Sequence, residues 1–133
     1  GWGAIGIVAA LINQNGHLVL TDIDSRAEKV AADNVHRLGL QDRVSVLATD
    51  DVSQINGSFD LILSNPPFHA DTVTLVNLFK AASDKLRKKG SIYVVVEKTY
   101  LSKLKKVLEQ TFRHVKVYYE DMNTNFFVLV SRK

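Results

Sequence analysis

The stretch FDLILSNPPF, residues 59–68, decides the fold, because an apolar strand runs directly into two prolines. A proline has no backbone donor and biases the residue before it toward extended geometry, so Pro66 and Pro67 should end the strand with rigid, unpaired carbonyls. Ligands of open α/β sheets bind at this carboxyl end of the strands. With the Asn65 amide and the Phe68 ring beside those carbonyls, the loop is predicted to receive a planar group bearing an NH2, either an amide or a nucleobase.

Outward from this loop, short apolar runs alternate with stretches of helical periodicity over the whole chain. This alternation predicts an α/β fold with a mostly parallel sheet, and the continuous apolar run at residues 91–96 is typical of a strand buried on both faces. Two final runs close the chain as an antiparallel pair. The predicted strands are residues 17–21, 44–47, 59–64, 91–96, 114–119 and 125–130, and the predicted helices are residues 4–13, 25–38, 72–89 and 100–112.

Local patterns define the ends of these helices. Residues 25–28, SRAE, form a capping box, which predicts that Ser25 caps the second helix. Residues 85–89, KLRKK, put cations where the dipole of the third helix favours them, and Gly90 is expected to end that helix. The lysines of the last helix lie outside its apolar stripe and should stay in solvent; they are Lys103, Lys105 and Lys106.

Length and composition bound the kind of protein. At 133 residues the chain can bury one core but has no room for a second, so we expect a single domain. The absence of cysteine excludes disulfides, cysteine-based zinc sites and thiol catalysis, and no metal site is predicted. No apolar run reaches membrane-spanning length and no signal peptide is present, so a cytoplasmic protein without a membrane partner is expected. The net charge of +3 permits a polyanionic partner without establishing one.

Glycines and acids near the N-terminus suggest a second ligand site. Gly1, Gly3 and Gly6 open directly into the first predicted helix, where backbone can approach a ligand, although glycines in loops are commonly just turns. Asp22 ends the next predicted strand, about 20 residues after the glycines, where a carboxylate can accept ribose hydroxyls. Asp50 lies shortly after the predicted strand of residues 44–47 and could accept a hydrogen bond from an adenine amine. Both acids could equally lie in solvated turns.

In this order, the motifs resemble those of the class I S-adenosylmethionine-dependent methyltransferases, whose fold is a doubly wound, Rossmann-like sheet. Residues 1–7 match the second half of the glycine-rich cofactor loop of that family, Asp22 matches its ribose-binding acid and Asp50 its adenine-contacting acid. Residues 65–68, NPPF, match its amino-methylating signature. The resemblance implies S-adenosyl-L-methionine as the cofactor, bound by Gly1, Gly3, Asp22, Asp50 and Asn65.

Within that superfamily, residues 64–69, SNPPFH, and the strands near residues 92–95 and 126–129 are most similar to the bacterial ribosomal RNA guanine-N2 methyltransferases. The resemblance implies methyl transfer to the exocyclic amine of a guanine in ribosomal RNA. That guanine must be single-stranded or flipped out, because a paired base cannot reach such a site. The implied catalytic residues are Asn65, Pro66, Pro67 and Phe68.

The chain departs from this family at its start, where the strand that precedes the glycine loop is missing. We therefore expect residues 1–133 to be one N-terminally truncated methyltransferase catalytic domain. Members of the family often carry a second, degenerate domain before the catalytic one. An additional N-terminal domain is accordingly expected in the full-length protein.

The resemblance also implies how the loop works. The Asn65 side-chain oxygen and the Pro66 carbonyl accept the two hydrogens of the target amine, Phe68 stacks on the base, and Pro67 keeps the loop rigid. Positioning and electrostatics carry most of such a rate. His69 is either a proton acceptor or a packing residue, and Lys98 is either a phosphate contact or a solvated lysine.

Three other functions stay open. The same Asn-Pro-Pro-aromatic pattern serves enzymes that methylate a protein glutamine or a DNA adenine, although the glutamine enzymes usually have tyrosine where this chain has Phe68. The missing strand argues for a non-catalytic RNA-binding relic of the fold, and the intact NPPF loop argues against it. A nicotinamide-dependent oxidoreductase is disfavoured because that loop has no role in hydride transfer.

Overall fold

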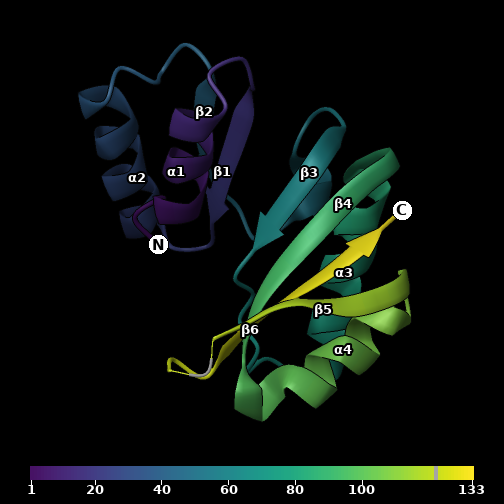
Figure 1. Ribbon diagram of the computed structural model, residues 1–133. Helices are drawn as coiled ribbons and strands as arrows, with labels where there is room; N and C mark the ends of the chain where they lie inside the picture. The colour runs from purple at the N-terminus through teal and green to yellow at the C-terminus, as the bar shows by residue number, and fades with distance from the viewer. Residues whose placement is uncertain (122) are drawn as a thin grey trace. The chain divides into compact units, whose positions relative to one another are not determined.

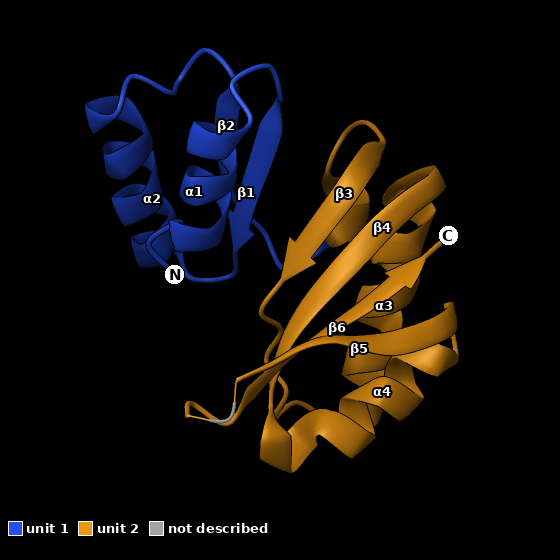
Figure 2. Ribbon diagram, in the orientation of Figure 1, with its two compact units in different colours: residues 1–51 blue, residues 52–133 orange. Residues whose placement is uncertain are grey.

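The computed structural model describes residues 1–121 and 123–133, which form an α/β protein (Figure 1). They divide into two compact units, residues 1–51 and residues 52–133 (Figure 2), and each is described by itself. In chain order the elements are α1 (Ala4–Ile12), β1 (Leu18–Asp22), α2 (Ser25–Arg37), β2 (Val44–Ala48), the 3-10 turn η1 (Val52–Gln54), β3 (Phe59–Ser64), α3 (Thr72–Lys85), β4 (Leu86–Glu97), the 3-10 turn η2 (Lys98–Tyr100), α4 (Leu101–Glu109), β5 (Arg113–Asp121) and β6 (Phe126–Arg132).

Residues 1–51 contain a parallel strand pair with two helices. Strands β1 and β2 pair from Leu18 opposite Val44 to Asp22 opposite Ala48. Helix α1 lies so close to β1 that a Cβ on Gly6 would be 1.9 Å from the Leu20 Cδ2 atom, which explains the glycine at that position. The apolar sides of the helices and strands meet in one small core, made of Ile7, Ala10, Val35, Leu40 and Val44.

Residues 52–133 contain a four-stranded mixed sheet in the order β3-β4-β6-β5. Strands β3 and β4 are parallel, and β6 runs antiparallel to both β4 and β5, which confirms the predicted antiparallel pair at the end of the chain. Helices α3 and α4 pack on one face of this sheet, because their apolar residues share a core with alternate residues of β4 and β6. That core includes Leu75, Phe79, Ile92, Val94, Val96, Leu104, Leu108 and Leu129.

The central strand β4 differs from its prediction in burial. Ile92, Val94 and Val96 are fully buried, whereas Tyr93 and Val95 between them are only partly buried. Helices α3 and α4 pack on the side of β4 that carries Ile92, Val94 and Val96. The expectation of burial on both faces was therefore wrong, and the tyrosine side of the strand stays partly open.

Helix α3 ends at Lys85, four residues before the predicted end at Lys89. Leu86 is buried and pairs with Phe59 of β3, so burial and sheet hydrogen bonds outweigh the local preference for helix. Arg87 accordingly lies in β4, where its guanidinium donates to the Asp60 carboxylate at 2.7 Å. Besides Lys85, a second cation lies at the C-terminal end of α3, and it belongs to the last residue of the chain. Lys133 Nζ donates to the Ser83 and Leu86 carbonyls at 2.6 and 2.9 Å.

Aspartates cap the N-termini of α2 and α3. Asp24 caps α2, with its carboxylate accepting from the Arg26 amide at 2.9 Å, so the prediction that Ser25 is the cap was off by one residue. The Arg26 side chain, followed by its backbone amide, lowers the pKa of Asp24. Asp71 caps α3, and hydrogen bonds from the Thr74 amide and hydroxyl lower its pKa. In the part of the chain that the structure describes, no helix has the length and apolarity needed to cross a membrane.

Candidate functional site

Strands β1 and β2 end at the same edge of their sheet, and this edge carries the two predicted acids. Asp22 is the last residue of β1 and lies opposite Ala48, the last residue of β2. The Thr49 amide donates to the Asp22 carbonyl at 2.9 Å and extends the pairing by one step. Asp50 is exposed one residue further on. Asp22 and Asp50 therefore emerge from neighbouring strands at one edge, as the alternation of strand and helix predicts.

The Asp22 carboxylate also meets the glycine stretch. Its Oδ2 atom accepts from the Gly1 nitrogen, and its Oδ1 atom accepts from the Asp24 amide at 2.9 Å. The second hydrogen bond turns the chain directly after β1 and fixes the direction of the carboxylate. The structure thus brings together Gly1 and Asp22, which lie 21 residues apart in the sequence.

Gly3 begins helix α1 in the left-handed conformation, with φ of 88°, which favours glycine. No side chain caps this helix, so its first-turn amides remain available to a polar ligand group. The Asp22 carboxylate can accept hydrogens from hydroxyl groups, and the first-turn amides of α1 can donate to a polar group. Both kinds of contact fit S-adenosylmethionine, the cofactor that the resemblance implies. The assignment of Gly1, Gly3, Asp22 and Asp50 to that cofactor stays a prediction.

In the other unit, the NPPF loop follows β3 as predicted, but its carbonyls are not unpaired. The Pro66 carbonyl accepts from the Phe68 amide at 2.8 Å, and the Pro67 carbonyl accepts from the Ala70 amide at 2.8 Å. The prediction of unpaired carbonyls was therefore wrong, because the chain turns tightly and brings later amides back to them. A carbonyl oxygen has two lone pairs, so Pro66 can still accept one further hydrogen bond. Asn65 beside it is exposed, and Pro66 itself is buried.

Lys103 of α4 contacts the end of this loop, and the sequence did not predict this contact. Its Nζ donates to the Ala70 carbonyl at 2.6 Å and to the Phe68 carbonyl at 3.3 Å. The prediction that Lys103 stays in solvent was wrong, whereas Lys106 is exposed as expected. No local pattern distinguishes these two lysines, since the contact joins Lys103 to a loop that lies 33 to 35 residues earlier.

An aromatic cluster surrounds the end of the loop. The Phe68 ring centroid lies 4.9 Å from that of His69 and 5.0 Å from that of Tyr100. Tyr100 Oη and His69 Nδ1 are 2.7 Å apart and share a hydrogen bond. His69 therefore packs and hydrogen-bonds within the cluster, and Tyr100 is a second site residue that the sequence did not reveal. Lys98, predicted to be either a phosphate contact or a solvated lysine, is exposed.

Metal binding has no support from the side chains of residues 1–121 and 123–133. Within these ranges no group of three or more histidine, aspartate or glutamate side chains could hold a metal ion. The loops of the described residues offer carboxylates and helix amides in residues 1–51, and amide, carbonyl and aromatic groups in residues 52–133.

Comparison with known proteins gives the family. The family model of the methyltransferase small domain matches residues 1–129. The ribosomal RNA small subunit methyltransferase C of Shewanella loihica is 31% identical over 136 residues, which cover 100% of this chain and 39% of the relative. The ribosomal RNA large subunit methyltransferase G of Pseudomonas paraeruginosa is 35% identical over 115 residues, which cover 80% of this chain and 30% of the relative. The chain thus spans less than half the length of these relatives.

Solved structures agree on the fold. A 16S rRNA N2 methyltransferase of T. thermophilus, solved in complex with AdoMet and guanosine, matches with a TM-score of 0.81 at 23% identity. The match covers 100% of this chain and 35% of that one. At this identity the likeness concerns the fold, and it confirms the Rossmann-like α/β architecture expected from the sequence. Because the family model spans both units, the chain belongs to the methyltransferase small domain family.

Proposed function

We propose that this chain is the catalytic domain of an S-adenosylmethionine-dependent methyltransferase whose target is the N2 amine of a guanine in ribosomal RNA. The observation that carries the proposal is the NPPF loop, in which the exposed Asn65 amide stands beside a Pro66 carbonyl with one lone pair to spare. Relatives named as ribosomal RNA methyltransferases support the choice of acceptor. Because ribosomal RNA is the proposed partner, we propose that the protein acts in the cytoplasm.

The donor side of the reaction is assigned to residues 1–51. Gly1, Gly3, Asp22 and Asp50 would hold S-adenosylmethionine, with Asn65 as a further contact, and the bound cofactor supplies an activated methyl group on a sulfonium. The Asp22 carboxylate is already oriented by the Asp24 amide, so it can accept hydroxyl hydrogens without further ordering. Such fixed acceptors contribute to binding because little entropy is lost when the ligand arrives.

The acceptor side is assigned to the loop of residues 65–68. The amine of guanine is a weak nucleophile because its lone pair is delocalised into the ring. Asn65 Oδ1 and the second lone pair of Pro66 would accept its two hydrogens, which localises the electron pair on nitrogen. Phe68 would fix the plane of the base by stacking. No strong general base is required at the outset, because the amine becomes acidic only after it is methylated.

Lys103 is assigned a positioning role, because its Nζ donates to the carbonyl of Phe68, at the end of the loop, and to that of Ala70, two residues later. We expect Lys103→Met to lower kcat by about 10-fold, because a looser loop places the reacting atoms less well. The Michaelis constant for the cofactor should change little. Steady-state kinetics of Lys103→Met, Lys103→Arg and the exposed Lys106→Met would measure this effect. Partial recovery in the arginine variant and full activity in the Lys106 control are expected; equal losses at both lysines would contradict a positioning role.

Transfer of a tritiated methyl group tests the proposed function itself. The full-length protein is incubated with labelled S-adenosylmethionine and, in separate reactions, with undermodified ribosomal RNA, DNA or protein release factors. We expect label in RNA alone, at the N2 atom of guanine after digestion to nucleosides. Label only in protein or only in DNA would overturn the acceptor. Failure to bind S-adenosylmethionine at millimolar concentration in calorimetry would overturn the methyltransferase assignment.

A further inference from the structure

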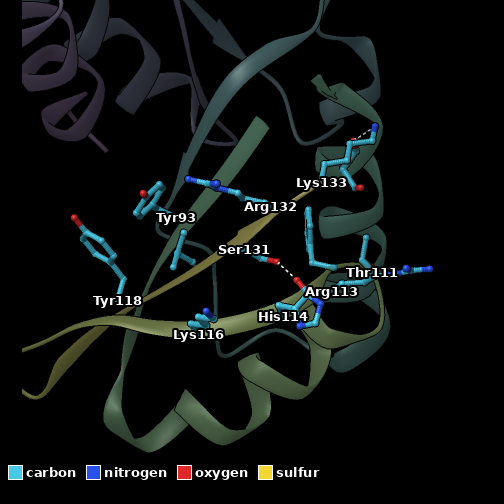
Figure 3. A pocket seen from close by; sticks show the side chains of 12 residues that line it. Tyr93, Thr111, Arg113, His114, Lys116, Tyr118, Ser131, Arg132 and Lys133 are labelled. Atoms are coloured by element: carbon cyan, nitrogen blue, oxygen red, sulfur yellow. Dashed lines mark hydrogen bonds between the residues drawn. The ribbon is translucent and has the colours of Figure 1, made fainter. Parts of the chain in front are cut away.

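A groove of about 850 Å³ lies in the unit of residues 52–133, and none of the loop residues 64–70 lines it (Figure 3). The groove runs over β4, β5 and β6. Arg113, His114, Lys116, Arg132 and Lys133 are among the twelve lining residues, which include no aspartate or glutamate. We call this surface the β5–β6 groove.

The sheet register explains why cations gather in the groove. Arg113 of β5 lies opposite Arg132 of β6, and Lys116 lies opposite Val130, which in turn lies opposite Tyr93 of β4. Among the residues that the structure describes, none of these three cations forms an ion pair. An anionic partner would provide the missing counter-charge.

Two tyrosines accompany these cations. The Tyr93 and Tyr118 rings meet edge to face, with centroids 5.2 Å apart and an interplanar angle of 89°, so each fixes the orientation of the other. Tyr118 is nevertheless 67% exposed. In Figure 3 the Arg132 side chain extends toward Tyr93, beside Tyr118. The groove therefore offers a rigid, open aromatic face next to positive charge.

The distribution of charge along the chain points to the same kind of partner. Residues 52–133 hold 13 lysines and arginines against 7 aspartates and glutamates, a net charge of +6. Residues 1–51 hold 4 lysines and arginines against 7 aspartates and glutamates, a net charge of −3. The modest overall charge of +3 thus conceals one strongly basic unit, and a basic surface attracts polyanions at long range.

We propose that the β5–β6 groove binds a single-stranded segment of the RNA substrate, with phosphates at Arg113, Lys116 and Arg132 and a base stacked on Tyr118. Single-stranded nucleic acid is bound by this combination of a cationic track and aromatic stacking platforms. An acidic peptide would use the cations but not the open ring, and a duplex keeps its bases stacked away from side chains. The inference takes RNA as the partner from the proposed function and adds a second contact surface to the loop at Asn65.

Fluorescence anisotropy with a labelled RNA of about 10 nucleotides tests the groove, since sites of this kind span about 4–16 nucleotides. The double variant Lys116→Gln/Arg132→Gln should bind at least 10-fold more weakly and lower the slope of log K against log salt by about 2. Tyr118→Ala should weaken binding by about 5-fold or more with an unchanged slope, because stacking is worth about 1–3 kcal/mol per base. Tyr118→Phe keeps the ring and should bind like the wild type.

Controls separate this inference from the proposed function. Lys106→Gln removes an exposed lysine outside the groove lining and should leave RNA affinity nearly unchanged. All variants should bind S-adenosylmethionine like the wild type. If the protein transfers methyl groups but the groove variants bind RNA as tightly as the wild type, the role of the groove is overturned and the proposed function is not. If the groove variants weaken RNA binding but the protein transfers no methyl group, the proposed function is overturned and the role of the groove is not. The single-strand assignment would also be overturned if duplex RNA bound as tightly as the single strand. Binding to anionic vesicles that depends on Tyr118 would overturn it as well.

Discussion

Replacing Asn65 by alanine is expected to lower the rate of methyl transfer by about 10²–10³-fold, the loss seen when one oriented hydrogen-bonding group is removed from a reacting centre. The proposed role of the Asn65 oxygen is to accept a hydrogen from the amine and so concentrate its lone pair on nitrogen. The Pro66 carbonyl cannot replace it, because one of its lone pairs accepts from the Phe68 amide and the other is assigned to the second hydrogen of the amine.

Kinetics and calorimetry together measure this loss. The affinity for S-adenosylmethionine should be nearly unchanged in Asn65→Ala, because Gly1, Gly3, Asp22 and Asp50 carry most of the proposed cofactor contacts. A fall in kcat with constant cofactor affinity indicates an interaction made mainly in the transition state. Asn77→Ala, which alters an exposed asparagine of α3, is the matched control and should retain full activity. Full activity in Asn65→Ala would refute the assigned role.

Replacing Phe79 by alanine should lower the free energy of unfolding by about 3–5 kcal/mol, the usual cost of truncating a buried phenylalanine. Phe79 is 1% exposed and belongs to the core formed by α3, α4, β4 and β6. The loss combines the transfer of apolar surface to water with a cavity that its packed neighbours cannot fill. Small domains are stable by only about 5–15 kcal/mol, so the variant would lose a large share of its stability.

Val73→Ala is the control for this prediction, because it lies on the same helix and is 68% exposed. Its effect on unfolding should stay within about 0.5 kcal/mol. Urea titration of the full chain, followed by far-ultraviolet circular dichroism, gives both values. A loss below about 1 kcal/mol at Phe79 would contradict the assigned core, since large-to-small changes in packed interiors cost more.

Local sequence patterns predicted most of the elements. Apolar periodicity located β1, β2, β3, β5 and β6 to within two residues at each end, whereas β4 begins five residues earlier than expected, at Leu86. The edge shared by Asp22 and Asp50 was also predictable, because parallel strands end together. These features depend on residues that are neighbours in the sequence, and local propensity and periodicity describe such neighbours well.

The candidate site was only partly predictable. The NPPF loop was placed correctly at the end of β3, but its hydrogen bonding was not, because a tight turn returns the Phe68 and Ala70 amides to the proline carbonyls. Lys103 and Tyr100 went unnoticed since each reaches the loop from α4 or η2, more than 30 residues along the chain. Single lysines and tyrosines on amphipathic stretches carry no sequence mark of such contacts.

Local sequence patterns were sufficient to predict the α/β class, the proline-terminated strand with Asn65 after it, and the acids at the ends of β1 and β2. Each follows from backbone chemistry or apolar spacing within a short window. Three features depend on contacts between distant parts of the chain: the end of α3, the contact of Lys103 with the end of the NPPF loop, and the groove shared by Arg113, Lys116, Arg132 and Tyr118. In each case residues far apart in the chain contact one another. The burial, strand pairing and charge interactions of these contacts together outweigh the local preference for helix or for solvent exposure.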